Sequence, residues 1–206
     1  MRNLGLKKNF LLFIMYSIVG WILEVLLAFI CHGKFVNRGF LIGPYLPIYG
    51  IGCIFLVLFL EKRKDKPLLL IFCSMLICSL LEYITSVLLE IAFNTRWWDY
   101  SNNLINLNGR ICLETTITFG IMGAIIIYVV NPFFVKILEK LPVVTVNTLF
   151  YVLAIIFIAD CGISFTSATM LRNTYSGVLK DTTEQTSKKV ISFIRDIFIN
   201  IKEALI

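Results

Sequence analysis

The sequence predicts an all-α fold, namely a polytopic membrane helix bundle of about five transmembrane helices followed by a C-terminal amphipathic helix. Of its 206 residues, 58% are hydrophobic and only 16% are charged, and the mean hydropathy is +0.86. A soluble domain is about 45–50% apolar and about 25% charged, so this apolar excess is too large for a buried core alone. The composition therefore excludes a soluble enzyme, a disordered chain and a secreted disulfide scaffold.

Five apolar segments approach or exceed the length of about 20 residues that a helix needs to cross a bilayer. They are Asn9–Cys31, Phe40–Leu60, Leu68–Phe93, Ile111–Val135 and Val143–Phe165. The first segment is too long for a signal peptide and carries Glu24, so we interpret it as a retained span. We predict a transmembrane domain over residues 1–165 and a separate polar linker and helix over residues 166–206.

The first half of the second segment is rich in glycine and proline. Proline removes backbone donors and glycine weakens a helix, so this half is predicted to be kinked, unwound or re-entrant. Backbone that is not helical at membrane depth is tolerated only where it is buried in protein or lines a cavity. We favour a functional break over a simple proline kink, and its residues are Gly43, Pro44, Pro47 and Gly50.

In the tail, apolar residues recur at helical spacing opposite basic ones, a pattern that predicts a basic amphipathic helix. The apolar residues are Val190, Ile194, Ile197, Ile201 and Leu205. This helix is too short to be a sixth span. It is expected to lie on the membrane surface, to pack on a partner, or to cover the domain's own apolar side.

The net charge of +6 comes from 19 Lys and Arg residues against 13 Asp and Glu residues. The basic residues fall mostly between apolar segments, so we interpret the charge as a determinant of topology and expect no nucleic-acid partner. The N-terminus and the connections after the second and fourth segments are richest in Lys and Arg, which predicts a cytoplasmic N-terminus. Five spans would then place the basic tail outside.

Acidic side chains inside the predicted spans are the strongest functional signal, because they are costly there and are usually paired or functional. They are Glu24, Glu82, Glu90, Glu114 and Asp160. Glu82 lies nearest the midplane, and the other four share one half of the membrane by the count of spans. The connections at that face are polar, so we predict a polar cavity open to it.

The predicted ligand or charge-network site combines these acids with residues of the connections. It comprises Glu24, Asn37, Arg38, Glu82, Glu90, Trp98, Asp99, Asn108, Arg110 and Glu114. The alternative is a structural lattice in which Arg38, Arg96 and Arg110 neutralise the glutamates. One helical stripe of the first segment carries Ser17, Gly20, Trp21 and Glu24, and its small residues allow a second helix to approach closely.

The cysteines and the single histidine, His32, indicate neither a metal nor another cofactor. All six cysteines lie in or at the ends of apolar segments, and the chain has no CxxC motif. We interpret them as small buried hydrophobic residues. No nucleophile and base stand out as a pair, so the sequence offers no catalytic residues.

Several unusual strings occur in an order that resembles the putative ABC-transporter type IV family, also called CmpB-like. They are Tyr16-Ser17 with Gly20-Trp21 and Glu24, Asn37-Arg38-Gly39-Phe40-Leu41 with Gly43-Pro44 and Pro47-Ile48-Tyr49-Gly50, Leu81-Glu82-Tyr83 with Glu90, Trp97-Trp98-Asp99-Tyr100-Ser101, and Asn106 with Asn108-Gly109-Arg110-Ile111-Cys112. The resemblance covers residues 10–130 and implies an ABC-type permease, a multi-pass protein of the bacterial cell membrane.

The chain contains no GxxxxGK[ST] phosphate loop, so it does not hydrolyse ATP by that route. A permease role would need a separate ATPase subunit and, with only five spans, a second copy of the chain. Our first hypothesis is a transport component whose cavity recognises a small polar or cationic solute. The alternatives are a non-transport membrane scaffold or regulator with a structural Glu/Arg lattice, and an intramembrane enzyme with paired carboxylates.

Overall fold

A computed structural model of the chain describes residues 5–33, 35, 37, 39–94, 96–167 and 169. The chain divides into two units, Met1–Ser164 and Phe165–Ile206. Arg38 and the predicted C-terminal amphipathic helix lie outside the described residues, so both remain predictions.

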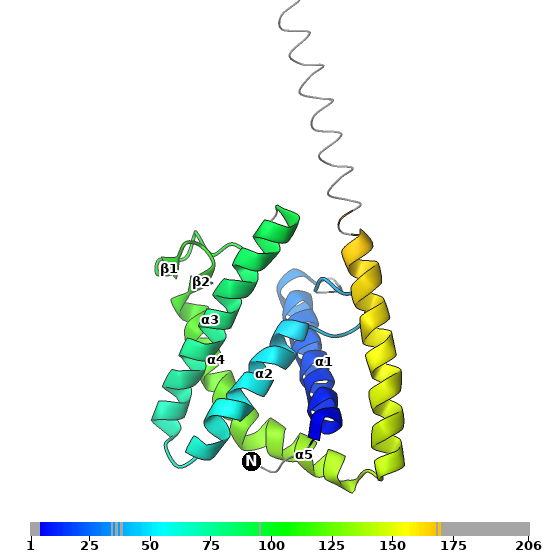
Figure 1. The fold of residues 1–206 in the computed structure, drawn as a ribbon. Helices are drawn as coiled ribbons and strands as arrows, with labels where there is room; N and C mark the ends of the chain where they lie inside the picture. Colours follow the sequence, from blue (N-terminus) through cyan, green and yellow to red (C-terminus); the bar gives the residue numbers. More distant parts are fainter. Residues whose placement is uncertain are drawn as a thin grey trace, which may run out of the picture. The chain divides into compact units, whose positions relative to one another are not determined.

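The described chain is predominantly helical, which confirms the predicted all-α membrane bundle (Figure 1). Four helices are long and apolar enough to cross a membrane: Gly5–Ile30, Pro67–Phe93, Leu113–Lys140 and Val143–Ser167. The labelled helices are α1 (Gly5–His32), α2 (Pro47–Leu60), η1 (Glu61–Arg63), α3 (Pro67–Phe93), α4 (Leu113–Ile125), η2 (Ile126–Val130) and α5 (Asn131–Lys140).

The second apolar segment differs from a complete span, so the described residues contain four helices of spanning length and not five. Its backbone is not helical from Gly39 to Leu46, and α2 has only 14 residues, or about 21 Å of helix. Pro47 begins the helix, at the position where a missing N–H costs no helical hydrogen bond. Of the four residues of the predicted break, Gly43 and Pro44 therefore lie in non-helical backbone, whereas Pro47 begins α2 and Gly50 lies inside it.

Close packing between α1 and α2 depends on the small residues of the predicted stripe. A Cβ atom on Gly20 would collide with the Tyr49 side chain, and one on Gly50 would collide with Ser17 and Phe13. Leu46 N–H also donates to the carbonyl of Ser17 at 2.9 Å. These contacts confirm the predicted close approach, and they hold the non-helical segment before α2 against α1.

Helices α3 and α4 approach each other in the same way. A Cβ atom on Gly123 would collide with Ser74, and one on Gly120 would meet Met75. Further along the interface the hydroxyls of Ser79 and Thr116 lie 2.9 Å apart and share a hydrogen bond. The closely packed helices α3 and α4 therefore support the connection that joins them.

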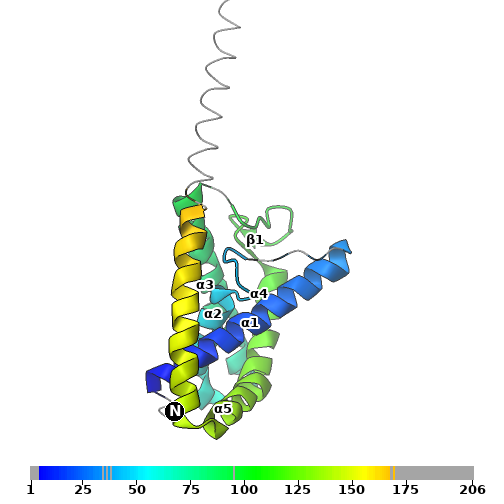
Figure 2. The ribbon, with the colours of Figure 1, turned by 90° about the vertical axis from the view of Figure 1, so that its right-hand side faces the viewer.

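The long helix Leu113–Lys140 changes direction at the π-helical turn η2 and at Pro132, two features that kink helices. As a result α5 runs across the end of the bundle where α3 begins (Figures 1 and 2). Tyr16 donates to the side-chain oxygen of the buried Asn131 at 2.7 Å. The Asn131 amide contacts Glu61 at 3.4 Å, which ties α5 to the connection before α3.

Two apolar clusters fill the interior. The first contains Leu11, Leu12, Tyr16, Cys53, Leu138 and Val146. The second contains Leu56, Leu60, Leu70 and Ile127. Cys53 thus packs as a small hydrophobic residue, as predicted. Many other large apolar side chains are exposed on the outer helix faces, as expected for a surface in contact with lipid.

Candidate functional site

A polar stripe on α3 organises the site. Ser79, Glu82, Ser86 and Glu90 recur at spacings of three and four residues, which places them on one face of the helix. The first three are buried in the bundle, although this helix is otherwise rich in exposed apolar residues. The stripe meets the connection between α3 and α4.

That connection folds back on itself as a small antiparallel hairpin of β1 (Asn106–Leu107) and β2 (Ile111–Cys112). Asn108 and Gly109 occupy its turn with φ of 54° and 66°, a conformation that Asn-Gly sequences favour. A Cβ atom on Gly109 would also collide with Asp99 and Ser101, so glycine is required there. The tight turn brings Arg110 back over α3.

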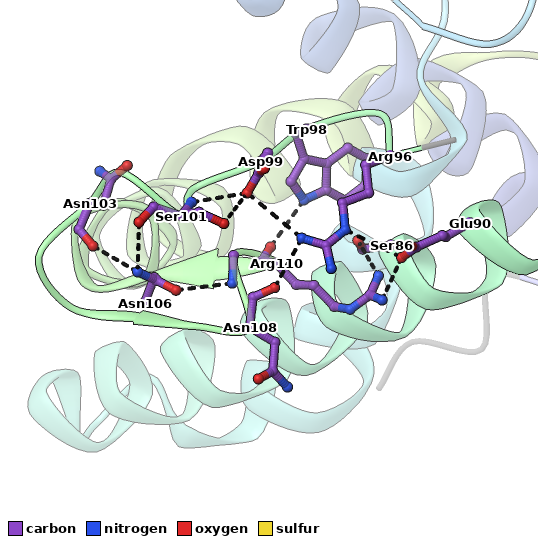
Figure 3. Close-up of polar contacts among 11 residues, drawn as sticks. Ser86, Glu90, Arg96, Trp98, Asp99, Ser101, Asn103, Asn106, Asn108 and Arg110 are labelled. Carbon is purple, nitrogen blue, oxygen red and sulfur yellow. Dashed lines mark hydrogen bonds and ion pairs between the residues drawn. The ribbon is translucent and has the colours of Figure 1, made fainter. Parts of the chain in front are cut away.

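Arg110 belongs to a charge lattice, by which we mean Glu90, Arg96, Asp99 and Arg110 (Figure 3). Its guanidinium lies 2.5 Å from Glu90 Oε2 and donates to Ser86 Oγ at 3.0 Å. Arg96 contacts the same Glu90 oxygen at 3.5 Å and Asp99 at 3.8 Å. The lattice therefore holds the connection between α3 and α4 against the end of α3.

Asp99 stabilises the connection itself. The hydroxyl and the backbone N–H of Ser101 donate to Asp99 Oδ1 at 2.5 and 3.0 Å. These hydrogen bonds, with the charge of Arg96 nearby, hold the pKa of Asp99 below its usual range. Trp98 adds a hydrogen bond from its indole N–H to the carbonyl of Arg110 at 3.0 Å.

A second group, which we call the acid–tyrosine cluster, comprises Glu24, Tyr49, Glu82 and Tyr100. The Tyr49 hydroxyl on α2 donates to Glu24 Oε1 on α1 at 2.6 Å. The Tyr100 hydroxyl, from the connection after α3, donates to Glu82 Oε1 at 3.1 Å. Four different elements thus contribute one side chain each.

The two pairs act on each other electrostatically. Burial raises the pKa of the Tyr100 phenol well above its ordinary value, and the negative charges of Glu82 and Glu24 raise it further. The carboxylates of Glu24 and Glu82 also lie within electrostatic range of each other. Tyr100 therefore stays a neutral hydrogen-bond donor at physiological pH, beside two acidic groups.

Glu82 is the least satisfied member of this cluster. Its side chain is buried, with the residue only 8% exposed, and among the described residues Oε2 has no hydrogen-bond partner. A protonated carboxyl would need an acceptor at this oxygen and an ionised one would need a donor. Unlike Glu90, neither Glu82 nor Glu24 forms an ion pair with a described Lys or Arg residue.

Asp160 belongs to neither group, although the sequence places it in the same half of the membrane. Its carboxylate accepts hydrogen bonds from the backbone N–H groups of Ile42 and Gly43 at 3.0 and 2.8 Å. The hydroxyls of Tyr45 and Ser164 donate to it at 2.5 and 2.8 Å. Asp160 thus anchors the non-helical segment before α2 to the helix Val143–Ser167.

The remaining predicted site residues make separate local contacts. Glu114 is exposed and accepts a hydrogen bond from Asn103. Asn37 accepts the indole N–H of Trp21 at 2.7 Å. Asn108 donates to the Tyr83 hydroxyl at 2.9 Å, and its carbonyl accepts from Arg96. The nine described residues of the predicted site therefore do not surround a single centre.

Sequence reasoning assigned no role to Tyr49 and Tyr100, which orient the two central carboxylates. Both occur in strings that carry the family resemblance, Pro47-Ile48-Tyr49-Gly50 and Trp97-Trp98-Asp99-Tyr100-Ser101. The sequence feature that could have indicated this role is a tyrosine close to a helix break, because a buried tyrosine hydroxyl usually has a hydrogen-bond partner.

The family model described as putative ABC-transporter type IV matches residues 11–165. The chain belongs to this family. The match includes the charge lattice, the acid–tyrosine cluster and Asp160, and it extends beyond the residues on which the resemblance rested. Membership and the four apolar helices support a transport-related, multi-pass membrane protein rather than an enzyme. The searches of curated proteins and of solved structures gave no match.

Proposed function

We propose that this chain is the membrane component of a transporter and that its acid–tyrosine cluster binds a small cationic solute. The observation that carries the proposal is the buried Glu82 carboxylate, which has one unpartnered oxygen and lies near Glu24. Family membership supports the transport role. The charge and geometry of the cluster support the solute class.

A cation would relieve the two energetic costs of this arrangement. A buried polar atom without a hydrogen bond costs free energy, and two neighbouring carboxylates in a medium of low dielectric constant repel each other. An ammonium or guanidinium group supplies both the missing donor and the opposite charge. The phenols of Tyr49 and Tyr100 already occupy one oxygen of each carboxylate, which leaves Glu82 Oε2 to face the solute.

The charge lattice favours a structural role for part of the predicted site, because its arginines are already paired with Glu90 and Asp99. Paired charges of this kind hold elements in place and leave no free charge for a ligand. If the acid–tyrosine cluster binds nothing, this lattice makes a membrane scaffold or regulator the second candidate function.

Replacing Glu82 by Gln is expected to weaken cation binding by about tenfold to a hundredfold, because a hydrogen bond to a charged group is worth about 1.5–3 kcal/mol. The probes are methylammonium, guanidinium and choline, titrated into purified protein in detergent. Binding is measured by the shift in thermal unfolding temperature. We expect at least one probe to stabilise the wild-type protein.

Glu114→Gln is the matched control, because it removes a carboxylate that is exposed and lies outside the cluster. It should keep the wild-type response to the probe. An equal response in wild-type and Glu82→Gln proteins, or no response to any of the three cations, would contradict the proposed site.

The proposal extends to the energy source and the assembly. Because the chain lacks a phosphate loop, transport driven by ATP would require a separate ATPase subunit, and a second copy of the chain would complete the pathway. We place the protein in the bacterial cell membrane with its N-terminus in the cytoplasm. The lysine-rich and arginine-rich connections at one end of the bundle support this orientation.

Cysteine labelling in intact cells tests the orientation. In a cysteine-free background, a cysteine at Asn102 is expected to react with a membrane-impermeant thiol reagent, whereas one at Lys62 is expected to react only after the cells are opened. Both positions are exposed, and they lie at opposite ends of α3 (Figure 1). The reverse labelling pattern would invert the assignment.

A further inference from the structure

The end of the bundle opposite the hairpin carries a second surface that the transport proposal does not use. We define the basic end surface as α5 together with the connection over residues 61–66. The Tyr128 hydroxyl donates to the carbonyl of Lys64 at 2.6 Å, and Asn131 contacts Glu61. The two segments are therefore held together as one platform.

Helix α5 has three distinct faces. Asn131 and Leu138 are buried against the bundle, with 1% and 2% exposure. Phe133 and Ile137, one turn apart, form an exposed apolar flank. On the neighbouring part of the helix lie two exposed lysines, Lys136 and Lys140.

An apolar flank beside a basic flank is the arrangement of a helix that lies in the membrane interface. Such a helix buries its apolar residues at the boundary of the acyl chains and places its basic residues at the level of the headgroups. α5 lies beyond the turn at η2 and runs across the end of the bundle (Figures 1 and 2), which is the position of a helix in the membrane interface. Its orientation therefore matches a lipid surface.

The charge of the platform selects the kind of lipid. Its basic residues are Lys62, Arg63, Lys64, Lys66, Lys136 and Lys140. Its acidic residues are Glu61, Asp65 and Glu139, of which Glu61 is engaged by Lys64 and by Asn131. Among the described residues, Lys136 and Lys140 form no ion pair with a carboxylate. The surface thus has an excess of positive charge, and two of its ammonium groups have no described carboxylate as a partner.

We propose that the basic end surface binds the phosphate headgroups of anionic phospholipids. Lys136 and Lys140 contact the headgroup phosphates, and Phe133 and Ile137 insert beside the acyl chains. The connection over residues 61–66 supplies further positive charge at the same level. This inference is independent of the acid–tyrosine cluster and of any transported solute.

The test uses the purified full-length chain in a neutral detergent, titrated with phosphatidylglycerol or with phosphatidylcholine. Phosphatidylglycerol is expected to raise the unfolding temperature more than phosphatidylcholine does. A Lys136→Gln, Lys140→Gln double variant should bind phosphatidylglycerol at least tenfold more weakly, because each lysine near an anionic surface contributes about 1 kcal/mol. Inorganic phosphate should give no comparable shift, since it lacks the acyl chains.

A Lys136→Arg, Lys140→Arg variant is the matched control, and it should keep the wild-type preference because the charge is retained. Raising the ionic strength should weaken the preference in the wild-type protein, since these charges are exposed and screened by salt. This salt dependence needs no variant. Equal stabilisation by the two lipids, or an unchanged affinity in the Gln variant, would overturn the proposal.

Discussion

Replacing Asp160 by alanine is expected to lower the free energy of unfolding by about 3–5 kcal/mol. The Asp160 carboxylate accepts four hydrogen bonds, two of them from the backbone N–H groups of Ile42 and Gly43. These donors belong to backbone that no helix satisfies, and a buried unsatisfied donor costs about 1–3 kcal/mol. Thermal unfolding of the purified protein in detergent measures the loss.

Two further variants show whether the stability depends on the charge of the Asp160 carboxylate or on a single one of its hydrogen bonds. Asp160→Asn keeps the shape but turns an NH₂ group toward a backbone donor, so it should be nearly as destabilising as alanine. Ser164→Ala removes one of the four hydrogen bonds and should cost about 1 kcal/mol. A wild-type unfolding temperature in Asp160→Asn protein would show that the carboxylate does not anchor the segment before α2.

Replacing Arg110 by alanine is expected to destabilise the protein by about 2 kcal/mol, because it leaves Glu90 without its main partner. A fully buried pair would lose about 3–5 kcal/mol, but the Glu90 side chain is 35% exposed, so solvent reduces the cost. Adding Glu90→Gln should restore part of the stability, since the uncompensated carboxylate is then removed. A double-mutant cycle on thermal unfolding measures the coupling.

Neutralising Glu82 and neutralising Glu90 should have different effects on the stability of the Arg110→Ala protein if the lattice is correct. Adding Glu82→Gln to Arg110→Ala should give no recovery, because Glu82 contacts Tyr100 and not Arg110. Arg96→Ala alone should cost less than about 1 kcal/mol, since its contacts are longer and more exposed. Recovery through Glu82 instead of Glu90 would contradict the pairing seen in the structure.

The fold class and the helix break in the second apolar segment were predictable from the sequence. The first depends on composition, and the second depends on the chemistry of neighbouring residues. The apolar excess predicted a membrane bundle, and the Gly/Pro run around Pro44 and Pro47 predicted a kinked, unwound or re-entrant segment. Hydropathy alone overestimated the second span. It counts apolar residues whether or not the backbone is helical, and here the helix begins only at Pro47.

The sequence by itself determined that acidic side chains gather in one half of the bundle, because the position of each residue along its span sets its depth. Only the tertiary structure decided which partner each acid has, since partners depend on how helices rotate and where connections return. Asp160 binds backbone 118 residues away, at Ile42. Arg110 reaches Glu90 through a turn that requires Gly109, and Glu82 is left with one unpartnered oxygen.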